Sequence, residues 1–368
     1  MKLPNYFPQP GWQEQNPEEI FDTVQECMDT VMRDISPADV AAVGITNQRE
    51  TLIVWDRETG KPLHNAIVWC DLRTDDLCHQ LTKRTGSKDA FRDKCGLPIS
   101  TYFSALKLRW LIENVPAVAE AIERGTLMVG TVDTWLLWKL TGQYVTDVSN
   151  ASRTMLLNLH SKKWDADVCR EIVGISPSIL PEIRSNSEIY GKIQQGPLSG
   201  IPVSGCIGDQ QAALLGQLCL RKGEAKNTYG TGCFLLMNTA EKPVASTHGL
   251  LTTVAFQLGP NAQCQFALEG SVAVAGAAVT WLQDNLGLIT SPQELNALAA
   301  SVPDSGGMYF VPAFSGLLSP YWRDDARGVM VGMTRFINKA HICRATLESS
   351  AYQTMDVLEV RSLMSFFY

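Results

Sequence analysis

The sequence predicts an α/β protein organised in two domains. Short apolar runs of strand length alternate along the chain with longer segments in which apolar residues recur at helical spacing. The length of 368 residues is sufficient for two domains. With 45% hydrophobic and 19% charged residues, the composition is that of a globular protein with a sizeable core.

Charge and cysteine usage exclude several classes of function. The net charge is −7 and the lysines and arginines do not cluster, so neither nucleic acid nor an anionic membrane is an expected partner. Ten cysteines without a CxxC pair, beside only five histidines, are typical of reduced thiols and not of disulfides or a zinc site. No signal peptide is expected at the start, and no run reaches membrane-spanning length. These features predict a cytoplasmic protein.

The first half of the chain opens with a helix and continues through alternating elements. Asn16, Pro17 and the acids Glu18 and Glu19 form a helix start, with an N-cap, a proline at the first position and negative charge in the first turn. A short helical turn is predicted after Ser36. The remaining expected elements are strands at 40–45, 51–55, 65–69 and 201–207, helices at 72–84, 104–114 and 132–140, and a loop over 185–200.

After residue 232 the pattern changes to strands and then to helices. Strands are predicted at 233–238, 251–256, 264–268 and 308–312, and helices at 270–286 and 341–358. The helix at 270–286 starts with small residues, which permit the close approach of a backbone or a nucleotide, although tight helix packing accounts for them equally well.

One stretch, 208–232, combines two features that favour phosphoryl transfer. Asp209 follows the apolar run 201–207, and a carboxylate at the end of a strand can act as a general base. Further on, the turn Gly230-Thr231-Gly232 lets backbone N–H groups close on phosphate oxygens. Each feature also has a simpler interpretation, since Asp209 is equally suited to be an N-cap and most such glycine turns are only turns.

Two other positions have both a structural and a ligand-binding interpretation. Arg49 and Glu50 follow a predicted strand, where a simple salt bridge is favoured over polar groups held for a hydroxylated ligand. Tyr102 lies just before the predicted helix at 104–114. An aromatic ring at such a position packs in the core more often than it contacts a ligand.

Several long motifs in a fixed order resemble one family. They are residues 44–50 (GITNQRE), 65–69 (NAIVW), 102–114 (YFSALKLRWLIEN), 208–214 (GDQQAAL), 227–234 (NTYGTGCF) and 328–348 (GVMVGMTRFINKAHICRATLE). On these residues the chain resembles the FGGY carbohydrate kinases, and among them the glycerol kinase branch. The likeness runs from about residue 8 to about residue 359.

The resemblance implies a two-domain, ribonuclease H-like fold of the actin and hexokinase type, with a substrate domain at 1–217 and a nucleotide domain at 218–368. It implies phosphorylation of glycerol by ATP with Mg²⁺, and a homo-oligomer. Asp209 would be the general base. The glycerol contacts that it implies are Arg49, Glu50, Trp69, Tyr102, Asp209, Gln210 and Phe234. The nucleotide contacts that it implies are Gly230, Thr231, Gly232, Gly276 and Thr280, the last standing where the family often has glutamine. No residue is assigned to the metal.

The chain departs from the family pattern at both ends, so the expected fold is incomplete there. An amino-terminal phosphate hairpin and a carboxyl-terminal adenosine segment have no counterpart, and the apolar tail at 361–368 resembles read-through. One alternative is therefore a shortened, non-catalytic variant that binds polyol or partner subunits. Another is a kinase for a different sugar such as a pentulose. The polar pair Arg49 and Glu50, beside an apolar surface formed by Trp69 and Phe234, favours glycerol over such larger sugars.

Overall fold

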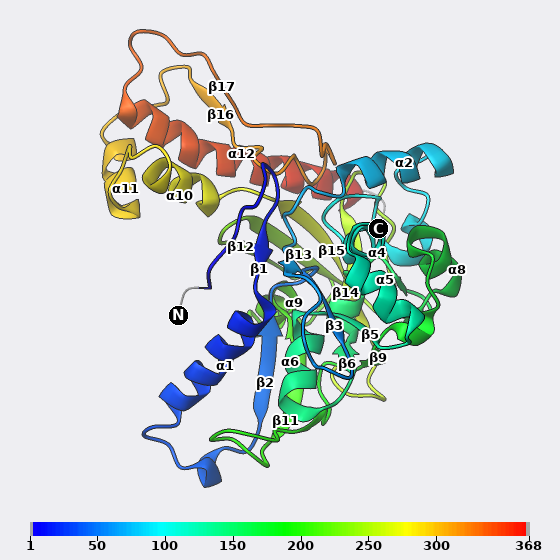
Figure 1. Cartoon of the computed structure of the whole chain (residues 1–368). Coiled ribbons are helices and arrows are strands. Elements are labelled where there is room, and N and C mark those ends of the chain that lie inside the picture. The colour runs from blue at the N-terminus through cyan, green and yellow to red at the C-terminus, as the bar shows by residue number, and fades with distance from the viewer. Residues whose placement is uncertain (1–2, 366–368) are drawn as a thin grey trace. The chain divides into compact units, whose positions relative to one another are not determined.

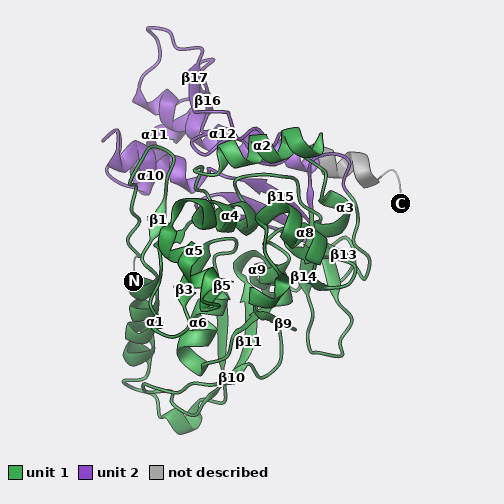
Figure 2. Ribbon diagram, turned by 45° about the vertical axis from the view of Figure 1, so that its right-hand side comes forward, with its two compact units in different colours: residues 1–224, 238–245, 252–267 green, residues 225–237, 246–251, 268–368 purple. Residues whose placement is uncertain are grey.

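The computed structural model describes residues 3–365 and the side chains of residues 3–359. The tail predicted at 361–368 lies outside the residues whose side chains are described. The chain divides into two compact units, coloured separately in Figure 2. Unit 1 comprises residues 1–224, 238–245 and 252–267, and unit 2 comprises residues 225–237, 246–251 and 268–368. Strands and helices alternate in both, which confirms the predicted α/β class.

Unit 1 contains two sheets that matter for the site. One has the strand order β1 (Glu14–Gln15), β4 (Ala66–Ile67), β3 (Leu52–Asp56) and β5 (Leu127–Thr131). The other has the order β10 (Gly191–Lys192), β11 (Pro202–Gly208) and β2 (Val43–Asn47). Two further pairs are β6 (Val145–Asp147) with β9 (Glu182–Arg184), and β7 (Leu157–Asn158) with β8 (Lys163–Trp164).

The pairing of β2 with β11 sets the position of the site. The two strands are parallel, and the last residue of each, Asn47 and Gly208, stand opposite each other. The chain therefore leaves both strands at the same edge of the sheet, as Figure 1 allows the reader to follow. Ligands of open α/β sheets bind at this carboxyl edge, because the loops that follow the strands converge there.

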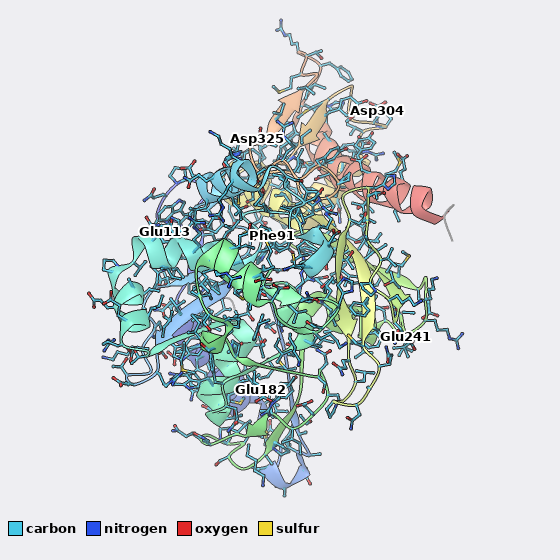
Figure 3. The ribbon with its side chains drawn as sticks, turned by 90° about the vertical axis from the view of Figure 1, so that its right-hand side faces the viewer. Phe91, Glu113, Glu182, Glu241, Asp304 and Asp325 are labelled. Atoms are coloured by element: carbon cyan, nitrogen blue, oxygen red, sulfur yellow. The ribbon has the colours of Figure 1, made fainter. Side chains whose placement is uncertain are left out.

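The helices of unit 1 begin and end at recognisable signals. In α1 (Pro17–Val31), the side chain of Asn16 accepts the N–H of Glu18 at 2.9 Å, as the sequence predicted. Figure 3 marks Glu113 near the end of α4 (Ser104–Asn114), where it pairs with Arg109 one turn earlier at 2.7 Å. The other helices are α2 (Asp75–Thr85), α3 (Arg92–Cys95), α5 (Pro116–Glu123), α6 (Val132–Thr141), α7 (Val148–Ala151), α8 (Ala166–Val168) and α9 (Asp209–Gly216), with short turns at Pro37–Asp39, Cys169–Val173 and Pro177–Ile179.

The main core of unit 1 is built around tryptophans. Trp55 on β3 and Trp135 on α6 are fully buried, and their ring centroids lie 5.3 Å apart in an edge-on arrangement. Trp138 stacks beside Trp135 with centroids 5.7 Å apart. This core also includes Ile45 of β2 and Val203 and Cys206 of β11, so it supports the strands that end at the site.

Unit 2 holds the glycine turn and the helices that follow it. Strand β12 (Ala225–Tyr229) pairs antiparallel with β13 (Cys233–Ala240), in a four-stranded sheet of order β12-β13-β15-β14. The division between the units runs through β13, β14 (Leu251–Phe256) and β15 (Gln265–Val272). The remaining elements are α10 (Gly276–Asp284), α11 (Pro292–Ala300), the hairpin strands β16 (Tyr309–Val311) and β17 (Val329–Val331), and α12 (Lys339–Ser365).

The differences from the sequence-based expectation include the start of α10 and the presence of β5. The helix expected from residue 270 begins only at Gly276, because β15 continues to Val272 and the small residues after it form the turn into the helix. Strand β5 was not expected, because it passes directly into α6 with no loop residue between the two elements. None of the helices in the described part of the chain combines the length and apolar character that crossing a bilayer requires.

Candidate active site

Arg49 occupies the edge where β2 and β11 end. Its side chain is 1% exposed, its Nε lies 3.2 Å from Oδ1 of Asp209, and its Nη1 donates to Oε1 of Gln211 at 3.2 Å. A Cβ at Gly208 would come within 2.8 Å of the Arg49 side chain, so glycine is needed at the end of β11 to let the arginine pass. The salt bridge favoured by the strand-end pattern is present, since Nε of Arg49 lies 4.0 Å from Oε1 of Glu50, but both side chains are buried.

Glu50 has an unusual backbone conformation. Its φ is 60°, which is the left-handed region that a residue with a side chain adopts only when its surroundings enforce it. Ser104 donates its hydroxyl to the carbonyl oxygen of Glu50 at 2.9 Å. The Glu50 carboxylate accepts a hydrogen bond from Nε of Arg153 at 2.6 Å, and its Oε1 lies 4.0 Å from Nε of Arg49. Strain of this kind clusters at ligand sites, which favours a functional role for Glu50.

Asp209 is the accessible carboxylate of this group. It is the first residue of α9, and Gly208 is the N-cap, so the N-cap interpretation of Asp209 is wrong. Its Oδ1 accepts the backbone N–H of Gln210 at 2.8 Å, and its Oδ2 accepts the Gln210 side-chain amide at 2.9 Å. The side chain is nevertheless 41% exposed. Asp209 is thus fixed in direction and open to a ligand, as a positioned proton acceptor must be.

Two aromatic side chains lie against each other in unit 1. Trp69 is half-buried and Tyr102 is nearly fully buried, with ring centroids 5.6 Å apart in an edge-on arrangement. Lys107 of α4 holds their backbone, since its Nζ donates to the carbonyl oxygens of Trp69 at 3.4 Å and of Tyr102 at 2.5 Å. Burial lowers the pKa of Lys107 to about 8, while the carboxylates of Asp71 and Glu50 act to raise it.

The glycine turn of unit 2 packs on the start of α10. The N–H of Gly276 donates to the carbonyl oxygen of Gly230 at 2.9 Å, and the N–H groups of Ala275 and Ala277 donate to that of Thr231 at 2.8 and 3.1 Å. A Cβ at Gly276 would lie 2.5 Å from the Gly230 oxygen, so the contact requires glycine. The structure therefore brings together three of the predicted nucleotide residues, Gly230, Thr231 and Gly276. Gly230 and Thr231 are exposed.

The remaining predicted residues of unit 2 are placed differently. Gly232 is buried, and a Cβ there would lie 2.3 Å from the carbonyl oxygen of Val272 on β15. Thr280 is exposed on α10, and its hydroxyl donates to the carbonyl oxygen of Gly276 at 3.4 Å. Phe234 is buried in β13 and belongs to unit 2, whereas the other predicted glycerol contacts belong to unit 1.

Three residues in contact with the predicted site were missed by the sequence reasoning. Gln211 accepts a hydrogen bond from Arg49, and Arg153 donates one to Glu50. Lys107 donates hydrogen bonds to the backbone carbonyl oxygens of Trp69 and Tyr102. Gln211 and Lys107 stand inside motifs already quoted for the family resemblance, so their polar side chains among apolar neighbours were the available signal. Arg153 offered no such signal, because a single arginine after a short polar run resembles any exposed loop residue.

A second buried polar cluster lies beneath the strand ends. The carboxylates of Asp133 and Asp147 and the thiol of Cys206 lie within 4.8 Å of one another. Burial, followed by the charge of Asp147, raises the pKa of Asp133 to about 7. Hydroxyl and amide donors occupy both carboxylates: Thr131 and Thr146 on Asp133, and Ser149, Asn150 and Asn186 on Asp147. The cluster is therefore a structural hydrogen-bond network that does not fit a metal ion.

Comparison with known proteins gives a consistent result. The family model for the N-terminal domain of FGGY carbohydrate kinases matches residues 1–216, and that for the C-terminal domain matches residues 225–361. A glycerol kinase of Nocardia farcinica is 56% identical over 96% of this chain and 70% of its own length. One of Arabidopsis thaliana is 54% identical over 98% of this chain and 71% of its own length.

Solved structures agree with the family models. A crystal structure of Plasmodium falciparum glycerol kinase with ADP has a TM-score of 0.82 and 41% identity, covering 98% of this chain and 73% of that one. A ligand-bound xylulose kinase of Lactobacillus acidophilus has a TM-score of 0.80 at 23% identity, covering 98% of this chain and 72% of that one, and shows the fold alone. These matches confirm the predicted two-domain fold of the actin and hexokinase type.

Proposed function

The chain belongs to the FGGY family of carbohydrate kinases, and from that premise we propose that it transfers the terminal phosphoryl group of ATP to glycerol. The observation that carries the proposal is the group formed by Arg49, Glu50 and Asp209 at the carboxyl edge of β2 and β11. The identity to relatives named glycerol kinase supports glycerol as the acceptor over a larger sugar.

Recognition of a polyol needs hydrogen-bond donors and acceptors that converge beside an apolar surface. Arg49 supplies N–H donors, while Glu50 and Asp209 supply acceptors, all with directions fixed by neighbouring side chains. Trp69, which is half-buried, provides aromatic surface for the carbon chain, and the Tyr102 ring packs against it. A smaller or less hydroxylated alcohol would leave these buried polar groups unmatched, which is how such a site rejects poor substrates.

Asp209 has the role of general base in this proposal. As the terminal hydroxyl oxygen of glycerol forms its bond to the γ-phosphorus, its proton passes to the Asp209 carboxylate, and the bond from phosphorus to the bridging oxygen breaks with ADP as the leaving group. Arg49, 3.2 Å from the same carboxylate, keeps the side chain aimed at one position. The products are glycerol 3-phosphate and ADP.

The nucleotide is assigned to the exposed turn Gly230-Thr231 and the start of α10. The packing of this turn on Gly276 supports the assignment, because it presents a rigid, side-chain-poor surface to which phosphates approach closely. Mg²⁺ would arrive with ATP, since it keeps several waters and binds through substrate phosphates and few carboxylates, and when bound it neutralises phosphate charge. No side chain is assigned to the ion, because Asp209 has the role of proton acceptor and hydrogen-bond donors occupy the carboxylates of Asp133 and Asp147.

The proposal is tested by measuring ADP release by the purified protein with glycerol, xylulose or gluconate as the acceptor. Glycerol-dependent ADP formation, with formation of glycerol 3-phosphate confirmed by mass spectrometry, is the expected result. Turnover that is faster with xylulose or gluconate than with glycerol would assign the chain to another acceptor. Binding of glycerol without any turnover would contradict the catalytic assignment.

We also propose the cytoplasm as the compartment and self-association as the state in solution. All ten cysteines are present as thiols and most are buried, which is typical of a reducing environment. Sedimentation velocity of the purified protein tests the proposed homo-oligomer, which a single monomeric species at micromolar concentration would contradict.

A further inference from the structure

Arg153 contacts two of the residues assigned to glycerol binding. We infer that it is a positioning residue, which holds the Glu50 carboxylate and the Tyr102 ring in the geometry that recognises the hydroxyl groups of the polyol. The inference rests on the proposed function and adds to it a residue that sets the affinity for glycerol without itself being assigned to contact it.

The hydrogen bond to Glu50 is the first observation. Nε of Arg153 lies 2.6 Å from Oε1 of Glu50, and the side chains of the two residues are 0% and 2% exposed. A charge-assisted bond that is shielded from water is strong and directional. Since Ser104 fixes the backbone of Glu50 at its carbonyl oxygen, Arg153 and Ser104 together hold the residue at both ends in its left-handed conformation.

The packing of the guanidinium on aromatic rings is the second observation. Cζ of Arg153 lies 5.6 Å from the ring centroids of both Tyr102 and Phe103, within the range of a cation–π contact. The same group that orients the Glu50 carboxylate therefore also orients the Tyr102 ring. Loss of Arg153 should disturb both at once.

The helix before Arg153 anchors it to both strand ends. Asp147 caps α7 by accepting the N–H groups of Ser149 and Asn150 at 2.8 and 3.0 Å. Asn150 exchanges hydrogen bonds of 3.1 and 3.0 Å with Asn47, the last residue of β2. The N–H of Gly208, the last residue of β11, donates to the Ser149 hydroxyl at 3.0 Å. Arg153 is therefore placed by the same segment that ties together the strands carrying Arg49 and Asp209.

A second buried arginine provides a matched control. The side chain of Arg73 is 0% exposed, binds Asp71 and Glu14 at 2.9 Å each, and lies 4.1 Å from the Trp12 ring. It thus resembles Arg153 in being buried against carboxylates and aromatic rings, with Asp71 and Glu14 in the place of Glu50. None of its partners is assigned to the glycerol site. Replacing either arginine by methionine removes a buried guanidinium at a similar structural cost.

The experiment compares the wild type with Arg153→Met, Arg153→Lys, Arg73→Met, Glu50→Ala and the double variant Glu50→Ala/Arg153→Met. Glycerol affinity is measured by calorimetry, kcat and KM by ADP release, and folding by the cooperativity of thermal unfolding. The lysine variant keeps the positive charge. If Arg153→Met does not fold, the glycerol affinity of Arg153→Lys still tests the inference.

We expect Arg153→Met to weaken glycerol binding about tenfold or more, with KM for ATP within about twofold of the wild type. Arg153→Lys should recover part of the loss. Arg73→Met should lower the melting temperature and leave glycerol affinity within about twofold. In the Glu50→Ala background, Arg153→Met should cause a smaller loss than in the wild type, because the part of its effect that passes through Glu50 is already gone and only the part that passes through Tyr102 remains.

Two results would overturn the inference. One is an Arg153→Met protein that binds glycerol as tightly as the wild type, with Arg153→Lys unchanged as well. The other is an equal loss of glycerol affinity in Arg153→Met and Arg73→Met, which would make the effect a general cost of removing a buried arginine.

Failure of the proposed function gives a different pattern. A wild type that neither binds nor phosphorylates glycerol contradicts the proposed function itself. The crystal structure of ligand-free Arg153→Met then decides the positioning role. A Glu50 backbone that no longer has a positive φ in the variant supports that role. A Glu50 with the same backbone and side-chain conformation as in the wild type overturns it.

Discussion

At the scale of single residues, the site is an alternating row of charges that the fold has largely removed from water. Asp209, Arg49, Glu50 and Arg153 follow one another at distances of 3.2, 4.0 and 2.6 Å. Only Asp209 in this row is substantially exposed, at 41%. Burial of unpaired charges is costly, and in this row each charged side chain lies next to one of opposite sign. In the proposed function, the row presents acceptors and donors of fixed direction to glycerol at its Asp209 end.

Replacement of Arg49 by alanine should chiefly weaken glycerol binding. The change removes donors assigned to the substrate and leaves Asp209 and Gln211 without this partner. A hydrogen bond to a charged group contributes roughly 1.5–3 kcal/mol, which corresponds to a rise in KM for glycerol of about tenfold or more. KM for ATP should change by less than about twofold. Steady-state kinetics with each substrate varied in turn measures both quantities.

The matched control is Arg92→Ala, since Arg92 makes an ion pair with the exposed Asp89 at 2.7 Å. It should leave both KM values unchanged. A rise in KM for ATP as large as that for glycerol in Arg49→Ala would contradict the assignment of Arg49 to the polyol.

At the scale of elements, the turn between β12 and β13 is joined by backbone hydrogen bonds to the start of α10. Three backbone hydrogen bonds join them, and a Cβ at Gly276 would lie 2.5 Å from the Gly230 oxygen. Gly276→Ala must therefore displace the turn. We expect KM for ATP to rise several-fold, while glycerol affinity measured by calorimetry without nucleotide stays within about twofold.

Gly216→Ala is the control for added volume, because a Cβ at this position meets no atom within 4 Å. It should leave both substrates unaffected. An unchanged KM for ATP in a folded Gly276→Ala protein would show that the turn does not hold the nucleotide.

The buried pair Asp133 and Asp147 makes stability depend on pH. The pKa of Asp133 is raised from 3.8 to about 7, by burial and then by Asp147. Between these values the unfolded chain releases a proton that the folded chain keeps. The contribution of this group to the free energy of unfolding is therefore present below about pH 4 and is lost as the pH rises to about 7.

Asp133→Asn removes this dependence, because an amide does not titrate. Denaturant unfolding from pH 5 to 8 should show the variant gaining stability relative to the wild type up to about pH 7 and no further. The exposed Asp29, changed to asparagine, controls for the loss of one negative charge. A difference between Asp133→Asn and the wild type that is constant across this range would contradict the raised pKa.

At the scale of the whole molecule, the sequence predicted many of the longer elements but not the contacts between them. The cap of α1 at Asn16 and the bounds of α4 were correct, because both depend on local chemistry. The start of α10 was placed too early, because the small residues before Gly276 fit a turn as well as a helix. Burial of Arg49 and Glu50 was not predicted, since a strand end looks the same in sequence whether or not a second strand ends beside it.

Long-range partners explain what the sequence could not show. Arg153 meets Glu50 across 103 positions of the chain, and Arg49 meets Gln211 across 162. No local pattern encodes such a pairing. Which residues touch the substrate stays a prediction from the family resemblance, and the structure adds residues that contact them, such as Gln211 and Arg153.

The most direct test of the central claim, that the carboxyl edge of β2 and β11 is the catalytic site, is Asp209→Asn. Asparagine keeps an acceptor for Arg49 and for the N–H of Gln210, so the shape is preserved while the proton acceptor is lost. Phosphoryl transfer to glycerol and calorimetric glycerol binding are measured on the same folded preparation. The account predicts kcat lower by about 10²–10⁴-fold, with glycerol affinity within a few-fold of the wild type. A folded Asp209→Asn protein with near-normal kcat would contradict it.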